Sequence, residues 1–158
     1  PAAETATETA AETAAGMTAV LATGIEADKD WRLSPHRGVV LIEFVSGTIV
    51  TPEMLTHVYH GLNAEPEKYR TTNVVWDLRN IVMHQSVGFD EVLRIVRHIK
   101  DSWDNRWSLD KSALVVSSKT AFGISRIYAS LVESNLDYKV QIFEKDLEAA
   151  IKWAQPKG

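Results

Sequence analysis

A histidine and a serine stand close together as His84-Gln85-Ser86, shortly after a strand-like run that ends in Asp77-Leu78. A serine hydroxyl beside an imidazole could act as a nucleophile, because histidine is a common base for serine. The G-x-S-x-G motif of many serine hydrolases is absent, however, and the sequence places no acid to orient the imidazole. These residues therefore give little support to a hydrolase.

Ser86 has two further interpretations, which the sequence leaves open. Serine is favoured at helix N-caps, and a helix-like run begins at Phe89. A phosphate on the same hydroxyl would gain from the helix macrodipole and would change the charge of a surface that a partner reads. We expect the hydroxyl to be accessible, either in the 79–88 loop or at the N-terminus of the next helix. The candidates for a partner surface around it are His84, Gln85, Gly88 and Phe89.

A second candidate site follows a buried-looking strand at residues 112–118. Phe122, Gly123 and Arg126 lie in the first turns of the helix that comes next. Ligands of open α/β sheets bind at the carboxyl ends of the strands, so these three residues are candidates for ligand binding. Close helix packing for Gly123 and a structural ion pair for Arg126 are the alternatives. No phosphate-binding glycine motif is present, so nucleotide binding has no support.

Metal and thiol chemistry have little to build on. His57 and His60 are three residues apart on a predicted helix, but no third ligand accompanies them, and solvent-exposed histidines are expected. The chain has no cysteine, which excludes disulfides, cysteine–zinc sites and thiol nucleophiles. We therefore expect no metal and no cofactor.

Composition narrows the class of protein further. The 158 residues carry a net charge of −4, which argues against a nucleic-acid-binding protein. No apolar run approaches the ~20 residues that a membrane span needs, and no signal peptide is evident. We expect a cytoplasmic protein.

Residues 1–16 differ from the rest of the chain. They consist of Pro, Ala, Glu, Thr and Gly, and they end directly before Met17. Such side chains offer nothing large and apolar to a core, so we expect a disordered or artificial acidic leader. The fold and the function are then carried by residues 17–158.

The elements that must position these residues alternate in kind. Residues 31–50 indicate a hairpin, with a strand at 31–33, a turn at 34–38 and a partner strand at 39–45. Thr51-Pro52-Glu53 predicts a helix start, and Leu55, Val58, Tyr59 and Leu62 its buried face. Further strands are predicted at 73–78, 112–118 and 138–145. Further helices are predicted at 89–103, 120–134 and from Asp146 onward.

This order predicts an α/β domain with a mainly parallel sheet, an N-terminal β-hairpin and four helices. The buried stripe of the 89–103 helix is expected to contain Phe89, Val92, Leu93, Val96, Ile99 and Trp103. Trp76, which lies between valines and Asp77 in a strand, is expected in the core.

The order of elements and the Asp77-Leu78 strand end resemble the STAS fold of anti-sigma-factor antagonists, and also the related lipid-binding CRAL-TRIO domains. In the antagonists, six residues separate such a pair from Asp-Ser-Ser-Gly, whose first serine a kinase phosphorylates. Here six residues separate the pair from Gln85-Ser86-Val87-Gly88, so Ser86 falls on the phosphorylated serine. The aspartate and the second serine are replaced by Gln85 and Val87.

Residues 25–155 also resemble small bacterial STAS-like proteins. The shared features are Ala121-Phe122-Gly123, Arg126, Tyr128, Phe143 and Leu147-Glu148-Ala149-Ala150 with Trp153. The resemblance implies a single STAS-like domain that acts as a non-enzymatic regulatory or protein-interaction module, with phosphorylation at Ser86 as its control. The alternative is a carrier or sensor of a small, lipid-like apolar ligand held between helices and sheet, and an enzyme comes third. A protein partner is expected, and a homodimer is compatible with the sequence.

Overall fold

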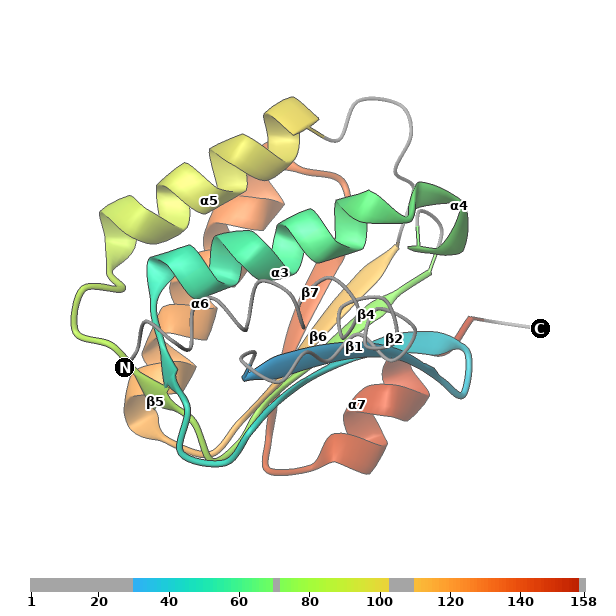
Figure 1. Cartoon of the computed structure of the whole chain (residues 1–158), viewed down its shortest axis with the longest axis horizontal. Coiled ribbons are helices and arrows are strands. Elements are labelled where there is room, and N and C mark those ends of the chain that lie inside the picture. The colour runs from blue at the N-terminus through green and yellow to red at the C-terminus, as the bar shows by residue number, and fades with distance from the viewer. Residues whose placement is uncertain (1–29, 70–71, 103–109, 157–158) are drawn as a thin grey trace, which may run out of the picture.

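The computed structural model describes residues 30–69, 72–102 and 110–156, which form a mostly parallel sheet with helices on both faces (Figure 1). The strand order is β1-β2-β4-β6-β7, in which β1 and β2 are antiparallel and every other neighbouring pair is parallel. The strands are β1 (Trp31–His36), β2 (Val39–Phe44), β4 (Val74–Leu78), β6 (Lys111–Val116) and β7 (Lys139–Glu144). The predicted α/β class and its mainly parallel sheet are confirmed.

The N-terminal hairpin forms as predicted, but its turn is tighter. Strand β1 continues through Ser34, Pro35 and His36, which were predicted as turn residues. The turn consists of Arg37 and Gly38, with φ angles of 53° and 87°. Positive φ at both central positions is the requirement of the two-residue turn that matches strand twist. Because β1 is an edge strand, Pro35 can lie within it without breaking the sheet.

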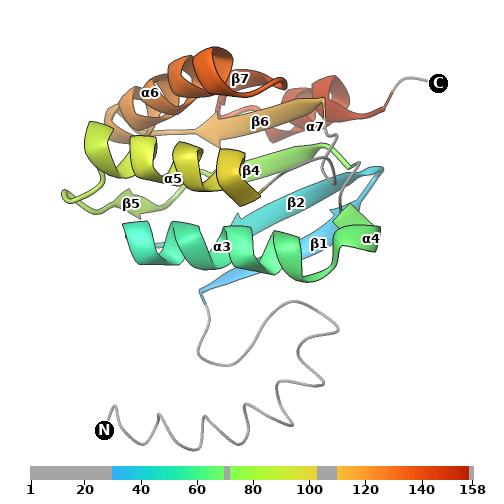
Figure 2. The ribbon, with the colours of Figure 1, turned by 90° about the horizontal axis from the view of Figure 1, so that it is seen from above.

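Helices cover the two faces of the sheet unequally. Figure 2 shows α3 (Pro52–Ala64), α5 (Phe89–Ser102) and α6 (Lys119–Asn135) on one face, and α7 (Leu147–Ala154) on the other. The described residues contain a fifth helix, the short α4 (Pro66–Tyr69), so the predicted number of four is wrong. Proline at its first position favours this extra turn, since it presets the backbone for a helix start.

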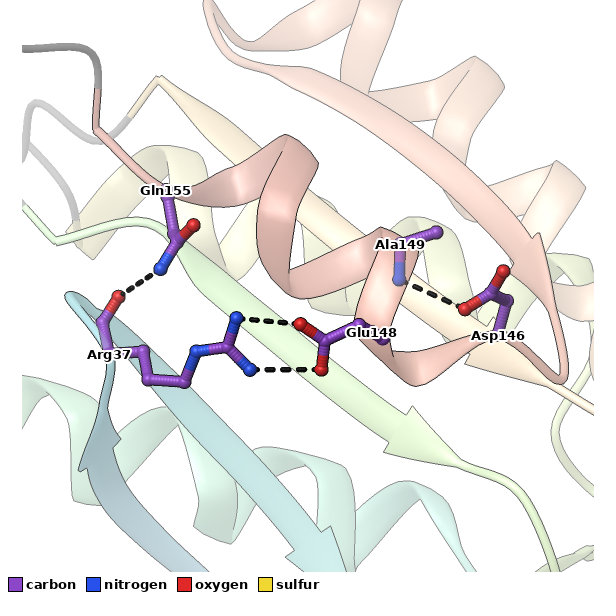
Figure 3. Close-up of polar contacts among 5 residues, drawn as sticks. All are labelled: Arg37, Asp146, Glu148, Ala149 and Gln155. Carbon is purple, nitrogen blue, oxygen red and sulfur yellow. Dashed lines mark hydrogen bonds and ion pairs between the residues drawn. The ribbon is translucent and has the colours of Figure 1, made fainter.

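The helix starts follow the capping residues in the sequence. The Thr51 side chain accepts a hydrogen bond from the Met54 amide, with Pro52 at the first helical position of α3. The Asp146 carboxylate accepts one from the Ala149 amide, 2.9 Å away, at the start of α7 (Figure 3). Both predicted caps are confirmed.

The two sheet faces carry separate cores because successive strand residues point to opposite sides. Trp76 is 4% exposed and packs under α3, where its ring centroid lies 5.4 Å from that of Tyr59. Val75, the neighbour of Trp76 on β4, lies with Ala150 and Ile151 of α7 on the other face. Trp76 is therefore a core residue, as predicted.

The buried stripe of α5 differs from its prediction at Phe89, Leu93 and Ile95. Val92, Val96 and Ile99 are buried as predicted, Ile95 is buried although it was not predicted, and Leu93 is only half-buried. Phe89 was predicted on the stripe but is 53% exposed, because it is the first residue of α5 and lies where the helix begins. The predicted last member, Trp103, lies outside the described residues.

A second, two-stranded sheet was not predicted. Strand β3 (Ile49–Val50) pairs in parallel with β5 (Val82–Met83), so that Ile49 lies opposite Val82. Two-residue strands are too short to show an alternating pattern in the sequence. Strand β5 of this small sheet leads directly into the loop that contains Ser86.

An ion pair fastens the hairpin turn to the last helix. The Arg37 guanidinium donates two hydrogen bonds to the Glu148 carboxylate, at 2.9 and 2.6 Å, and the Gln155 side chain donates to the Arg37 carbonyl (Figure 3). The hydrogen bond from Arg37 lowers the pKa of the Glu148 carboxyl below its ordinary value. The two ends of the described fold are thereby held together on the α7 side of the sheet.

Candidate functional site

The Ser86 loop, residues 84–88, joins β5 to α5 and is fastened at several points. The His84 amide donates to the Val50 carbonyl of β3 over 2.9 Å, and the His84 carbonyl accepts from the Val87 amide over the same distance. The Val87 side chain is buried in the core between the sheet and the helices α3, α5 and α6. Gln85 and Ser86 are exposed between these anchors. The loop therefore presents Ser86 from a backbone that its neighbours hold in place.

Ser86 and His84 are in direct contact. The Ser86 amide donates to Nδ1 of His84 over 3.0 Å, and the Ser86 Oγ lies 2.7 Å from the same nitrogen. An amide N–H can only donate, so Nδ1 must carry its lone pair and the ring proton resides on Nε2. The Ser86 hydroxyl is then the donor to Nδ1. The pair that the sequence merely placed two residues apart is thus in hydrogen-bond contact.

Ser86 does not cap α5. The Gly88 carbonyl accepts the first helical hydrogen bond, from the Val92 amide, which makes Gly88 the N-cap. The Glu91 carboxylate accepts from the Gly88 amide at 3.1 Å, as the third-position acid of a capping box does. Of the two positions expected for Ser86, the structure shows the loop. Glutamate at 91 is the signal in the sequence that pointed to the true cap.

The end of β4 leads into a turn that Asp77 shapes. The Asp77 carboxylate accepts two hydrogen bonds from the Arg79 guanidinium, at 2.8 and 2.9 Å, and a third from the Arg79 amide. Asn80 then adopts a left-handed backbone, with φ of 62°, and its carbonyl accepts from the Gly47 amide. Asp77 thus shapes the turn out of the strand, and its carboxylate is occupied by Arg79.

Apolar side chains are exposed next to this loop. Phe89, which follows Gly88, is 53% exposed, and Val82 on β5 is also 53% exposed. Ile49, opposite Val82, and Val45 in the turn before β3 are exposed to a similar degree. We call Val45, Ile49, Val82 and Phe89 the exposed apolar residues. Ile49 and Val82 lie opposite each other in the β3–β5 pairing, and large contiguous groups of exposed apolar side chains are typical of interaction surfaces.

The second candidate site lies on α6. The Arg126 guanidinium lies over the Phe122 ring, 5.8 Å from its centroid, while Phe122 itself packs partly against the larger core. A Cβ at Gly123 would meet no atom within 4 Å, so close helix packing does not explain this glycine. The structure brings Phe122 and Arg126 together, with Gly123 open to solvent beside them.

An apolar cavity lies between the sheet and the helices α3, α5 and α6. Phe122, Gly123 and Arg126 do not line it. Its volume is about 50 Å³. Its lining residues are Leu55, Tyr59, Trp76, Leu78, Met83, Val92, Ile95, Leu114, Ile124, Ser125 and Tyr128. Ligand pockets usually measure about 300–1,000 Å³, whereas a single water needs about 10–15 Å³ of such cavity volume. The cavity therefore has room for a small apolar group and not for a ligand of ordinary size.

Three buried tyrosines form a hydrogen-bonded chain beside the cavity. The Tyr59 hydroxyl donates to that of Tyr128 over 3.1 Å, and the Tyr128 and Tyr138 hydroxyls are 2.6 Å apart. Burial raises the pKa of the Tyr59 and Tyr138 hydroxyls well above the ordinary tyrosine value. This hydrogen-bonded chain was not predicted from the sequence. The signal was available, because a tyrosine on a buried face ordinarily finds a partner for its hydroxyl.

The histidines of α3 gather with one from α5. The ring centroids of His57 and His60 lie 6.4 Å apart, and those of His60 and His98 lie 5.9 Å apart. All three side chains are exposed. Within the three described ranges, no group of three or more His, Cys, Asp or Glu side chains is arranged to hold a metal ion.

Comparison with known proteins adds no identification. No family model matches the chain, and neither a curated protein nor a solved structure matches it. Among the described residues, no helix has the length and apolar character that crossing a membrane requires.

Proposed function

We propose that this chain is a non-enzymatic regulatory or protein-interaction module of STAS type, with phosphorylation of Ser86 as its control. The observation that carries the proposal is the exposed Ser86 on a fastened loop at the start of α5. A modifying enzyme needs an accessible hydroxyl, and a partner needs a surface whose shape is preset. The Ser86 loop meets both requirements.

The surroundings of Ser86 support a protein partner. Phe89 exposes about half of its surface three residues beyond Ser86, and Val82 does so four residues before it. Aromatic side chains are enriched in the cores of protein interfaces, whereas isolated charges are depleted there. A phosphate on Ser86 would add close to two negative charges to such a surface. We therefore expect phosphorylation to weaken binding through this surface.

The lipid-like ligand of the carrier alternative has less support from the structure. The cavity of about 50 Å³ offers room for a small fragment of an acyl chain. Residues Phe122, Gly123 and Arg126 do not line it. The proposal therefore takes protein binding, rather than lipid binding, as the function of the module.

A comparison of captured proteins tests the proposal. Wild type and the Ser86→Asp variant are immobilised and exposed to lysate of the native cells, and bound proteins are quantified by mass spectrometry. We expect at least one protein that wild type captures to be reduced severalfold by Ser86→Asp. Ser134→Asp, at an exposed serine near the end of α6, is the matched control and should leave capture unchanged.

Two outcomes would contradict the proposal. Wild type and Ser86→Asp could capture the same proteins to the same extent, in which case the charge at Ser86 is not read. Ser134→Asp could reduce capture as much as Ser86→Asp, in which case added charge anywhere is responsible. A thermal unfolding curve of each variant shows whether it is folded before the comparison is made.

A further inference from the structure

The contact between His84 and Ser86 has a direction that bears on reactivity. Because the Ser86 amide donates to Nδ1, this nitrogen is held as an acceptor, and the hydroxyl at 2.7 Å donates its proton to it. The remaining lone pairs of Oγ then face away from the imidazole. This is the relationship of a nucleophile to its general base.

We infer that His84 is the general base that activates Ser86 toward phosphoryl donors. The inference rests on the proposed function in taking Ser86 as the acceptor, and it adds a chemical role for the neighbouring residue. It predicts an intrinsic reactivity that the chain has by itself, before any partner is present. The substrate class is an electrophilic phosphoryl group.

The Oγ–H bond of Ser86 breaks, and its proton passes to Nδ1 of His84. An Oγ–P bond forms while the bond from phosphorus to its leaving group breaks. With a nucleoside triphosphate held by a kinase, the leaving group is the nucleoside diphosphate. With a fluorophosphate reagent, it is fluoride.

Several contacts keep the base where it is. The His84 amide donates a hydrogen bond to the Val50 carbonyl, and the His84 carbonyl accepts one from the Val87 amide. The buried Val87 side chain anchors the loop in the core. The ring is oriented by the Ser86 amide itself. The Ser86 Oγ is already within hydrogen-bond distance of Nδ1, and the hydrogen bond from the Ser86 amide to Nδ1 is released when that nitrogen takes the proton.

Modification by diisopropyl fluorophosphate tests the inference on the full chain. The rate of adduct formation at each serine is followed by peptide mass spectrometry. Ser134 serves as an internal reference, since it is exposed and its hydroxyl donates to the Ser130 carbonyl rather than to a base. General-base catalysis contributes about 10²–10⁴-fold in enzyme sites, and less in a solvated loop. We expect Ser86 to react at least about tenfold faster than Ser134.

His84→Asn separates the chemical role from the structural one. The asparagine side-chain oxygen can accept the Ser86 amide hydrogen in an Asx turn, so the loop is retained, but an amide is not a base. We expect the Ser86 rate to fall to that of Ser134 while the thermal midpoint changes little.

The inference is overturned if Ser86 reacts no faster than Ser134, or if folded His84→Asn reacts as fast as wild type. The proposed function can fail separately. Ser86 could be reactive while Ser86→Asp captures the same proteins as wild type. His84 would then be the base for Ser86, but a charge at Ser86 would not affect the binding of a partner.

Discussion

The hydroxyl of Tyr59 on α3 donates to the hydroxyl of Tyr128 on α6, although 69 residues separate the two in the chain. Both side chains are buried, and Tyr128 is in turn paired with Tyr138 just before β7. A polar chain of this kind joins two helices and the edge of the sheet across a mostly apolar core. Because of this tyrosine chain, we expect the free energy of unfolding to depend on pH and on each tyrosine hydroxyl.

The unfolding free energy should fall steeply at alkaline pH. The folded-state pKa of Tyr59 and Tyr138 is raised by burial, so their contribution to stability is complete below the unfolded tyrosine value of about 10 and is lost as pH rises beyond it. Urea unfolding between about pH 8 and 11 measures this. Tyr59→Phe should show a shallower decline, and equal slopes for the two proteins would contradict the account.

Tyr128→Phe should destabilise the protein at neutral pH. The change removes the acceptor of the Tyr59 hydroxyl, and a buried hydroxyl without its partner costs about 1–3 kcal/mol. Tyr69→Phe, at a buried tyrosine of α4 outside this chain, is the comparison. Urea unfolding of both variants should give the larger loss for Tyr128→Phe.

Filling the apolar cavity should stabilise the fold. Val92 lines the cavity, whereas Val96, one turn later on α5, is fully buried and does not. Val92→Ile adds a methylene next to empty space and should gain about 0.8 kcal/mol. Val96→Ile adds the same methylene to a packed region and should lose about 1–3 kcal/mol. A loss for both variants in chemical denaturation would mean that the cavity does not accept the added group.

The Arg37–Glu148 pair should contribute to stability only above acid pH. The pKa of Glu148 is lowered from 4.5 in the folded state, so its contribution is present above that value and disappears as pH falls through the folded-state value. The thermal midpoint of Glu148→Gln should lie below that of wild type at pH 7 and equal it near pH 2. Glu133→Gln, at an exposed glutamate of α6, is the control, and its thermal midpoint should equal that of wild type at both pH values. Because the pair is exposed, the difference should be small and should shrink in high salt.

The sequence predicted the parts of the fold that have a strong periodic or capping signal. Thr51-Pro52 and Asp146 marked two helix starts correctly, and the alternation of strands and helices predicted the mainly parallel sheet. Parts that depend on tertiary context were missed. The paired strands β3 and β5 have two residues each, and Phe89 fits the helical stripe of α5 yet lies exposed at its start.

The candidate site was predicted in its location but not in its geometry. Ser86 was expected in the loop or as a cap, and the pattern could not choose between the two because serine suits both. The Glu91 carboxylate accepts a hydrogen bond from the Gly88 amide, and this contact makes Gly88, rather than Ser86, the N-cap of α5. The direction of the hydrogen bond between Ser86 and His84 depends on a backbone amide that no residue pattern reveals.

Native mass spectrometry of the full chain purified from its own cells tests the central claim most directly. It reports phosphate and bound lipid in one spectrum, and peptide mapping then assigns any phosphate to a residue. The account predicts a fraction of molecules that carry one phosphate on Ser86, absent from Ser86→Ala, and no bound lipid. A chain that carries a lipid and no phosphate, under every growth condition sampled, would contradict it.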